Sequence, residues 1–178
     1  NNSNKDVHNL KIQSNTGNQK ASVISPVIRA HSTRKVIVPI DASTIHSLGE
    51  ILSDISIWNK SQLIDQKKIP LKSVNSNTPY RVTFISTIDN SLQYYAVNPA
   101  LGGEKSDDAL FLSVHGAGVE AIGQAQAYQA KDWGTLVAPT NRRPRGFNWE
   151  DWGRIDALEV LSLAKQTLQP DTQKIYLT

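Results

Sequence analysis

Hydrophobic and polar positions follow clear periods in the second half of the chain. Residues 80–88 alternate between apolar and polar side chains, a short turn follows, and residues 92–97 alternate again, so this segment predicts an antiparallel hairpin. Further along come three nearly unbroken apolar runs, which are typical of strands buried on both faces of a parallel sheet. These runs are residues 109–114, 135–138 and 174–177. Because helical patterns separate the runs, we expect the three strands to be parallel in one sheet, with the hairpin at its edge.

Two helices are expected between these strands, at residues 120–131 and 149–168. The second has Asn148 as its predicted N-cap and an acidic first turn formed by Glu150 and Asp151. Apolar side chains at helical spacing predict its buried face. These side chains are Ile155, Leu158, Leu161, Ala164 and Leu168.

The first part of the chain has a different pattern. Residues 1–20 are polar and rich in asparagine, which predicts a leader or an edge strand. Residues 22–72 carry short β-branched runs broken by proline and glycine, which predict a small β-sandwich-like module. Its expected strands are residues 23–29, 35–40, 54–58 and 68–74, and the only stretch that could be helical is around residues 47–52. A turn-rich joint over residues 75–79 ends the module, so the predicted fold class is α/β, with domains at residues 1–78 and 79–178.

Composition narrows the classes of protein to which this chain can belong. The chain has 178 residues, of which 39% are hydrophobic, and this is enough for one domain or for a domain and a fragment. It contains no cysteine, which excludes a disulfide scaffold, a cysteine-ligated zinc site and a cysteine nucleophile. The composition still allows catalysis by serine, histidine or carboxylate side chains. The net charge of +3 is too small to indicate a nucleic-acid-binding protein, and no apolar stretch approaches the roughly 18 residues of a membrane-spanning helix.

The start of the chain suggests a piece of a longer protein. The first residue is Asn1, no secretory signal opens the sequence, and methionine is absent throughout. We therefore expect a processed or excised stretch.

The most informative local arrangement is the segment His115-Gly116-Ala117-Gly118, which lies between a predicted strand and a predicted helix. Glycines directly after a strand let the backbone turn sharply and leave N–H groups without partners. Such N–H groups can face an oxygen that becomes negatively charged during a reaction, as in an oxyanion hole. Glycine turns after strands are common, so the tetrapeptide by itself is equally compatible with an ordinary turn.

Four segments that include this turn resemble, in order and spacing, successive parts of an α/β-hydrolase. They are residues 112–118, 137–143, 149–157 and 174–178, and they are most similar to the prolyl-oligopeptidase-like serine peptidases and esterases of bacteria. The resemblance covers about residues 80–178 and does not extend to the N-terminal module. In that family the strand that resembles residues 174–178 runs directly into the nucleophile elbow G-x-S-x-G. The nucleophile would then be the third residue after Thr178, and the chain would hold the first half of the hydrolase sheet, without the catalytic serine, acid and histidine.

The resemblance implies a role for each residue of the turn. The backbone N–H of Ala117 would be the oxyanion donor, Gly116 and Gly118 would keep it accessible, and His115 would be structural instead of a catalytic base. The implied reaction is attack by serine, a tetrahedral oxyanion, an acyl-enzyme and its hydrolysis by water, with no cofactor and no metal. The implied partners are an ester or peptide substrate and the remainder of the hydrolase domain, in the same chain or in a cleaved one. The implied location is secreted or periplasmic.

A second conspicuous segment, residues 141–149, carries three arginines and two aromatic residues just past a predicted parallel strand. Ligands bind outside the carboxyl ends of strands in open α/β sheets, so this loop is placed to contact substrate. Its candidate substrate-binding residues are Asn141, Arg142, Arg143, Arg145 and Trp149. The alternative is a solvated loop whose arginines pair with Glu150 and Asp151. Binding to nucleic acid is disfavoured because the basic segment is short.

The remaining chemistry-bearing residues are expected to be structural. Trp58, Trp133 and Trp152 should anchor a core or an interface, because single tryptophans normally bury surface area. Asp156 and Glu159 are expected to make ordinary surface or capping contacts. The competing function for the whole chain is a non-catalytic binding module or an inactive hydrolase homologue that recognises carbohydrate or protein.

Overall fold

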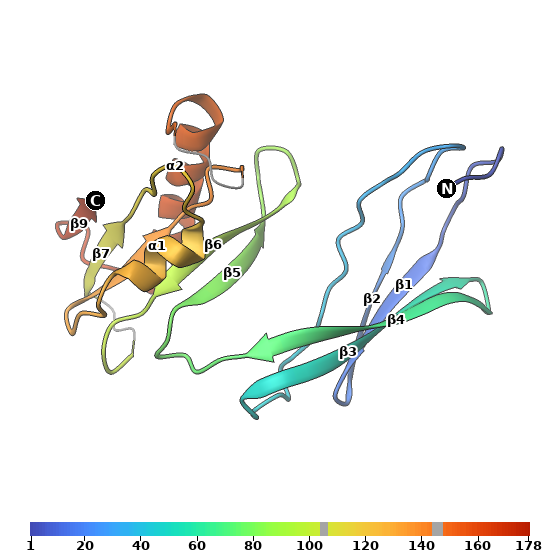
Figure 1. The fold of residues 1–178 in the computed structure, drawn as a ribbon, viewed down its shortest axis with the longest axis horizontal. Coiled ribbons are helices and arrows are strands. Elements are labelled where there is room, and N and C mark those ends of the chain that lie inside the picture. Colours follow the sequence, from blue (N-terminus) through green and yellow to red (C-terminus); the bar gives the residue numbers. More distant parts are fainter. Residues whose placement is uncertain (104–106, 144–147) are drawn as a thin grey trace. The chain divides into compact units, whose positions relative to one another are not determined.

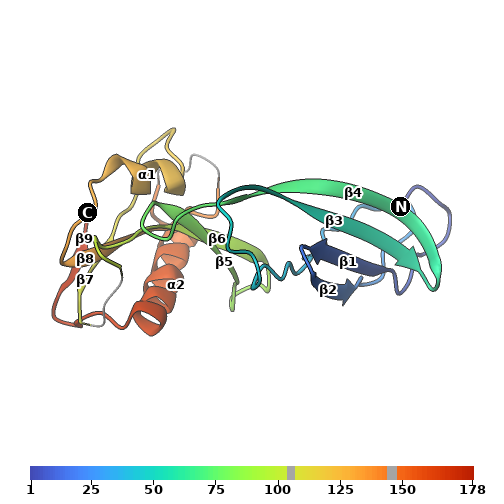
Figure 2. The ribbon, with the colours of Figure 1, turned by 90° about the horizontal axis from the view of Figure 1, so that it is seen from below.

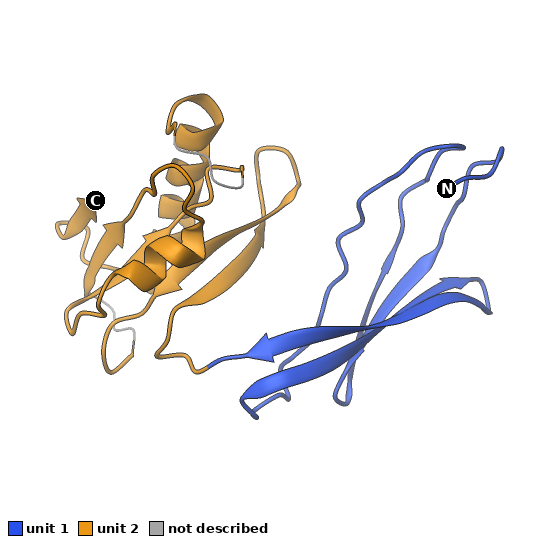
Figure 3. Cartoon of the chain, in the orientation of Figure 1, with its two compact units in different colours: residues 1–74 blue, residues 75–178 orange. Residues whose placement is uncertain are grey.

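The computed structural model describes residues 1–103, 107–143 and 148–178. It divides into two compact units, Asn1–Val74 and Asn75–Thr178, which Figure 3 colours separately. Each unit has its own β-sheet, and both described α-helices belong to the second unit. Neither of these described helices is long and apolar enough to cross a membrane.

The first unit is a four-stranded antiparallel sheet with the strand order β2-β1-β3-β4. Its strands are β1 Lys11–Thr16, β2 Gln19–Ile24, β3 Gly49–Asn59 and β4 Gln62–Ser73. Alternate residues of β1 are buried, as the two-residue period of a strand requires, and two of them, Ser14 and Thr16, carry hydroxyl groups. Ser14 Oγ donates to the carbonyl oxygen of Pro39 at 2.6 Å, and the hydroxyls of Thr16 and Ser53 are hydrogen-bonded at 2.7 Å. Hydrogen bonding thus allows a polar strand to lie inside the sheet.

Several expectations for this unit are wrong. Residues 1–74, all of which the structure describes, hold one sheet, where a β-sandwich-like module needs two. Residues 35–40 form no strand, and Pro39 contributes to this because proline has no N–H to donate to a ladder. The stretch that could be helical, residues 47–52, is not a helix, and β3 begins within it at Gly49. β1 lies between β2 and β3, so residues 1–20 do not form only a leader or an edge strand.

The second unit is a five-stranded mixed sheet with the strand order β5-β6-β8-β7-β9 (Figure 1). Its strands are β5 Tyr80–Ile85, β6 Leu92–Asn98, β7 Ala109–Leu112, β8 Gly134–Ala138 and β9 Ile175–Leu177. β5 and β6 form the expected antiparallel hairpin at one edge. β7 is parallel to β8 on one side and to β9 on the other, which confirms the three predicted parallel strands. Together with the helices, this sheet gives the chain the mixed α/β class that the sequence indicates.

The connections between the parallel strands place a helix on each face of the sheet. Helix α1, Ala121–Ala127, connects β7 to β8, and helix α2, Asp151–Leu168, connects β8 to β9. α1 packs with Leu136 and Ala138 of β8, whereas α2 packs with the intervening residue Val137. Alternate residues of a strand point to opposite faces, so the helices cover opposite faces, as Figure 2 shows. Because β8 and β9 flank β7 on opposite sides, the strand order switches direction at β7, and ligands bind beyond the carboxyl ends of strands at such a switch.

The first turn and the buried face of α2 differ from the prediction. The helix begins at Asp151 with Glu150 as its N-cap, and Asn148 Oδ1 instead accepts a hydrogen bond of 2.8 Å from the Glu150 N–H. Leu158 is 52% exposed, although the predicted stripe would bury it. The residues that are buried are Gly153, Asp156, Ala157, Val160 and Ala164. Most of these side chains are small, so α2 approaches the rest of the unit closely along this face and Leu158 is turned toward solvent.

Gly153 makes the closest approach on this face of α2. A β-carbon placed there would lie 2.5 Å from Oδ1 of Asn141 and 2.7 Å from the carbonyl oxygen of Asn148. Both atoms belong to the part of the chain that precedes the helix, and Asn141 is fully buried. A side chain at position 153 would therefore push the loop after β8 away from the helix.

Candidate active site

The turn after β7 begins where the hydrogen bonding of the parallel strands ends. The N–H of Ser113 donates to the carbonyl oxygen of Val137 at 2.8 Å. The N–H of Val114 donates to the carbonyl oxygen of Thr178, and the N–H of Thr178 donates to that of Leu112, both at 2.9 Å. The turn therefore leaves the sheet at the carboxyl end of β7, beside the end of β9 and at the point where the strand order switches.

Two side chains hold successive peptide groups of this turn. Trp149 donates its indole N–H to the carbonyl oxygen of His115 at 2.9 Å. Nδ1 of His115 lies 3.1 Å from the carbonyl oxygen of Gly116, which is a hydrogen bond in the tautomer that carries its proton on Nδ1. The N–H of Val119 donates to the same oxygen at 3.4 Å. In a planar trans peptide the N–H points away from the preceding C=O, so holding the Gly116 carbonyl fixes the direction of the Ala117 N–H.

The amide of Ala117 is available to a bound group. Ala117 is exposed, and no described residue accepts a hydrogen bond from its N–H. Gly118 has a φ of +78°, in the left-handed region that favours glycine, so this glycine gives the turn its shape. Gly116 lies outside that region, and a β-carbon on it would have no other atom within 4 Å. Neither the backbone conformation nor the surrounding space therefore requires a glycine at position 116.

The ring of His115 is enclosed. It is 2% exposed and packs edge-on against the ring of Trp149, with the ring centres 5.1 Å apart. Its Nε2 is buried and has no hydrogen-bond partner among the described residues. A catalytic histidine is normally oriented by a carboxylate, and within the described part of the chain no carboxylate contacts this ring. The position suits a residue that holds the turn.

Arg142 lies at the centre of a largely buried ion-pair cluster. Its side chain is 7% exposed, and its guanidinium approaches three carboxylates, those of Asp89 at 3.0 Å, Glu159 at 2.8 Å and Asp156 at 3.6 Å. Nη2 also donates to the hydroxyl of Ser86. The cluster therefore connects the loop after β8 to the turn between β5 and β6 and to α2.

The carboxylates of this cluster have shifted pKa values. Hydrogen bonds from Ser91, with a further one from Arg142, lower the pKa of Asp89 to about 2. Burial of Glu159 opposes its ionisation, but hydrogen bonds from a backbone N–H and two hydroxyls, with the charge of Arg142, bring its pKa below the ordinary value. Burial raises the pKa of Asp156, and the opposing effect of Arg142 and the surrounding N–H groups is smaller.

The five candidate substrate-binding residues do not share one environment in the structure. Asn141 is fully buried and donates through Nδ2 to a backbone carbonyl oxygen at 2.7 Å. The side chain of Arg142 is held by its carboxylates, and Trp149 donates its indole N–H to the turn, so both groups have structural partners. Arg145 lies outside the described residues. Arg143 is the one member of the four described candidates that is exposed.

Other expectations around this loop are wrong. Asp156 is fully buried, and the side chain of Glu159 is 9% exposed, so neither makes an ordinary surface contact. Among the described arginines of the loop, Arg142 pairs with the acids of the cluster and Arg143 forms no ion pair, so neither pairs with Glu150 or Asp151, while Arg145 lies outside the described residues. Trp152 is 52% exposed, so of its two expected roles, in a core or at an interface, the role in a core is wrong. The sequence does carry a signal for the buried acid, since small and aliphatic residues flank it at helical spacing. They are Gly153, Ala157, Val160 and Ala164.

Two cavities lie beside the loop after β8. The larger has a volume of about 390 Å³ and the smaller about 180 Å³, and both are lined by Gln93, Arg142 and Arg143. The larger cavity continues to Trp152 at the start of α2, and the smaller one continues to Glu120, just before α1. No group of three or more His, Asp or Glu side chains among the described residues is arranged to hold a metal ion.

Comparison with known proteins finds similarity to solved structures. No protein-family model matches the chain, and no curated protein matches it. Among solved structures, the crystal structure of a thermostable esterase is similar to 99% of this chain, with 11% sequence identity and a TM-score of 0.43. The chain spans 64% of the length of that esterase. A likeness of this size does not assign an activity to the chain.

Proposed function

We propose that this chain carries the oxyanion-binding half of an α/β-hydrolase site, in a serine hydrolase that cleaves an ester or peptide bond. The observation that carries the proposal is the exposed amide of Ala117, whose peptide group is held through His115 and Trp149 and which has no acceptor among the described residues. N–H donors that are fixed before the reaction stabilise the oxygen that becomes negative in a tetrahedral intermediate. Such N–H groups need little reorientation when the negative charge forms on that oxygen.

The proposal puts the catalytic serine after β9. Thr178 is hydrogen-bonded to Leu112 and Val114, which supports a nucleophile that emerges beside the Ala117 turn. The serine hydroxyl attacks the substrate carbonyl carbon while a base takes its proton, and the carbonyl oxygen accepts a hydrogen bond from the Ala117 N–H. The intermediate then expels the alcohol or amine, which takes the proton, and water hydrolyses the acyl-enzyme by the same route. A second oxyanion N–H comes from the residue after the serine.

Within this class, we propose a prolyl-oligopeptidase-like esterase or peptidase with a secreted or periplasmic location. Both proposals extend the resemblance of residues 80–178, and the strand order around β7 is compatible with them. Cell fractionation tests the location, because recovery of the protein only with the cytoplasm would contradict it.

A fluorophosphonate probe tests the proposed class directly, because it reacts covalently with an activated serine. We expect the full protein to hydrolyse p-nitrophenyl acetate and to be labelled on a serine that follows β9. Ala117→Pro should slow both reactions, because both pass through an oxygen that gains negative charge. A folded protein that neither hydrolyses the ester nor accepts the label would instead be the non-catalytic module.

A further inference from the structure

We infer that the larger of the two cavities beside the loop after β8 is a subsite for a neutral sugar, and that the proposed hydrolase acts on an ester of a carbohydrate. This inference rests on the proposed function, because it names the substrate class of the same site. The cavity, of about 390 Å³, is within the usual size range of small-molecule sites. It lies between the start of β6, the loop after β8 and the start of α2, at the end of the sheet that carries the Ala117 turn.

The cavity is connected to the turn in two ways. Trp149, whose two neighbours in the chain line the cavity, donates its indole N–H to the carbonyl oxygen of His115. The smaller cavity shares Arg143 with the larger one and reaches Glu120, shortly after the turn. A substrate whose sugar occupies the larger cavity can therefore extend past Arg143 toward the Ala117 N–H.

The polar groups of the cavity wall suit hydroxyl groups. Arg143 can only donate hydrogen bonds, whereas ionised Glu150 and Asp151 can only accept them. All three are exposed, and none forms an ion pair within the described part of the chain. A sugar hydroxyl donates and accepts, so neighbouring hydroxyls of one ring can satisfy both kinds of group. Gln93 and Asn148 add side-chain amides to the same wall.

The charge of the wall argues against an anionic ligand. Arg142 lines the cavity, but its charge is balanced by the acids of its cluster, including Asp89 in the same wall. Among the described residues of the wall, one positive and two negative charges then remain, on Arg143, Glu150 and Asp151. Their sum of −1 does not favour a carboxylate or a phosphate, which binds best where positive charge is in excess. A neutral polyhydroxyl ligand has no charge that these acids would repel.

Trp152 supplies an apolar surface in this polar wall. It is 52% exposed, and the guanidinium carbon of Arg142 lies 5.5 Å from its ring centre. Arg142 is itself held by Asp89 and Glu159, so the ring is supported before any ligand binds. The negative face of an indole attracts polarised C–H groups, such as those on the face of a sugar ring, while the hydroxyls reach the polar wall. A half-exposed aromatic ring beside donors and acceptors is therefore matched to a pyranose.

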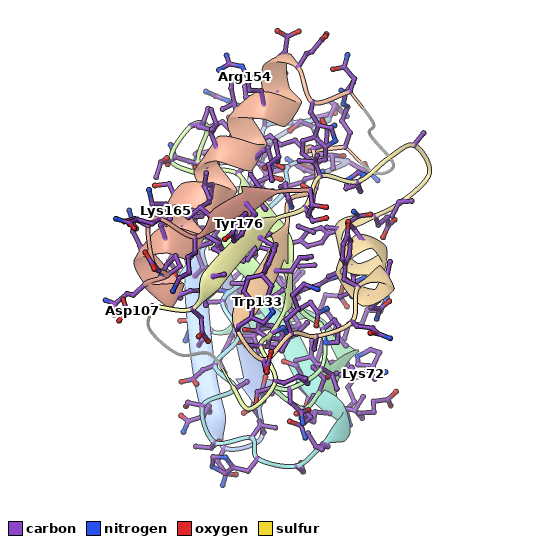
Figure 4. The ribbon with its side chains drawn as sticks, turned by 90° about the vertical axis from the view of Figure 1, so that its left-hand side faces the viewer. Lys72, Asp107, Trp133, Arg154, Lys165 and Tyr176 are labelled. Atoms are coloured by element: carbon purple, nitrogen blue, oxygen red, sulfur yellow. The ribbon has the colours of Figure 1, made fainter. Side chains whose placement is uncertain are left out.

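Isothermal titration calorimetry of the full protein tests this subsite. The neutral probes are xylotetraose, cellotetraose, mannotetraose and tetra-N-acetylchitotetraose, with trigalacturonate as the anionic comparison. We expect saturable binding of at least one neutral probe, and an increase in Kd of about tenfold in Arg143→Gln and in Trp152→Ala. Arg154→Gln is a matched control on an exposed guanidinium that does not line the cavity. Trp133→Ala is the second control, because its ring is 49% exposed and packs with Tyr176 (Figure 4). Both controls should change Kd by less than about twofold.

Three results would overturn the inference. They are no saturable binding of any neutral probe, tighter binding of trigalacturonate than of the neutral probes, and an unchanged Kd in Arg143→Gln. If Trp152→Ala fails to fold, Arg143→Gln decides alone, because that side chain is exposed. Hydrolysis of p-nitrophenyl acetate by the same preparations separates the two proposals. Hydrolysis without sugar binding removes the subsite and keeps the hydrolase, whereas sugar binding without hydrolysis or serine labelling removes the hydrolase.

Discussion

Trp149 and His115 are 34 residues apart in the chain and are joined by a hydrogen bond of 2.9 Å from the indole N–H to the backbone carbonyl oxygen. The same two residues pack ring against ring, with 5.1 Å between the ring centres. This pair attaches the start of α2 to the turn after β7. The direction of the Ala117 N–H therefore depends on a tryptophan that takes no part in any proposed chemical step.

Replacing Trp149 by phenylalanine keeps a ring against His115 and removes the hydrogen bond. We expect the free energy of unfolding to fall by about 1 kcal/mol, the net value of one hydrogen bond. The kcat for p-nitrophenyl acetate should fall about tenfold, because the donor for the oxyanion is less firmly held. Urea unfolding and steady-state kinetics measure the two effects.

Trp58→Phe is the matched control for this variant. The indole N–H of Trp58 donates to Ser56 Oγ at 2.9 Å in the first unit, so its loss removes a hydrogen bond of the same kind elsewhere. This control should lose similar stability and keep its kcat. Equal losses of kcat in the two variants would show that Trp149 does not position the turn.

Ala117→Pro deletes the proposed oxyanion donor, because proline has no backbone N–H. We expect kcat to fall by a factor of about 100 to 1,000, the range seen when one oxyanion donor is lost. Ala117→Gly keeps the N–H at the same position and should retain most of the activity. Circular dichroism establishes that both variants fold before their rates are compared. A folded Ala117→Pro protein with the original kcat would refute the assignment.

Removing Arg142 should destabilise the second unit far more than removing its neighbour. Arg142→Ala leaves the buried acids Glu159 and Asp156 without their cation, and breaking a buried ion pair in this way costs about 3–5 kcal/mol. Arg143→Ala removes an exposed side chain and should change the stability by less than about 0.5 kcal/mol. Thermal unfolding of the two variants measures the difference. Similar melting temperatures would show that the cluster does not hold the loop.

The second unit should also lose stability in acid. Asp89, with a pKa of about 2, and Glu159 both have lower pKa values in the folded chain than their ordinary values of 3.8 and 4.5. Their contribution to the free energy of unfolding is complete when the pH lies above the ordinary pKa values. It is lost as the pH falls through the pKa values of the folded chain. Asp156 acts with the opposite sign, because its raised pKa favours the folded state in acid and disfavours it at higher pH.

Glu159→Gln isolates one part of this acid dependence. The variant has no carboxylate to protonate at position 159, so the loss of unfolding free energy between about pH 7 and about pH 3 should be smaller than in the natural chain. Urea unfolding at the two pH values provides the comparison. An identical loss in both proteins would mean that the low pKa of Glu159 is not linked to folding.

The strands of the second unit can be predicted because each is marked by a period within a few consecutive residues. The alternation in residues 80–88 and 92–97 and the apolar runs near residues 110, 136 and 176 all contain their own signal. β1 has no such signal, because its buried positions are partly filled by Ser14 and Thr16, whose hydroxyls find partners only in the folded sheet. A pattern of hydrophobicity cannot report that kind of burial.

The environment of Arg142 is harder to predict, because its partners come from distant parts of the chain. Asp89 lies 53 residues before it and Glu159 lies 17 residues after it. The sequence does place this arginine past the carboxyl end of a parallel strand, and the structure agrees. Whether the side chain points to solvent or into an ion-pair cluster depends on tertiary packing, which local sequence patterns do not determine.

Because glycine has no side chain, the close packing at Gly153 predicts the effect of a mutation at this position. An added methyl group would meet Asn141 and the Asn148 carbonyl and displace the segment that leads to Trp149. The amide of Ala117 would then lose its support while every group in the proposed chemistry remained in place. We expect a Gly153→Ala allele to be temperature-sensitive, active in a cool culture and inactive in a warm one, although position 153 takes part in no proposed chemical step.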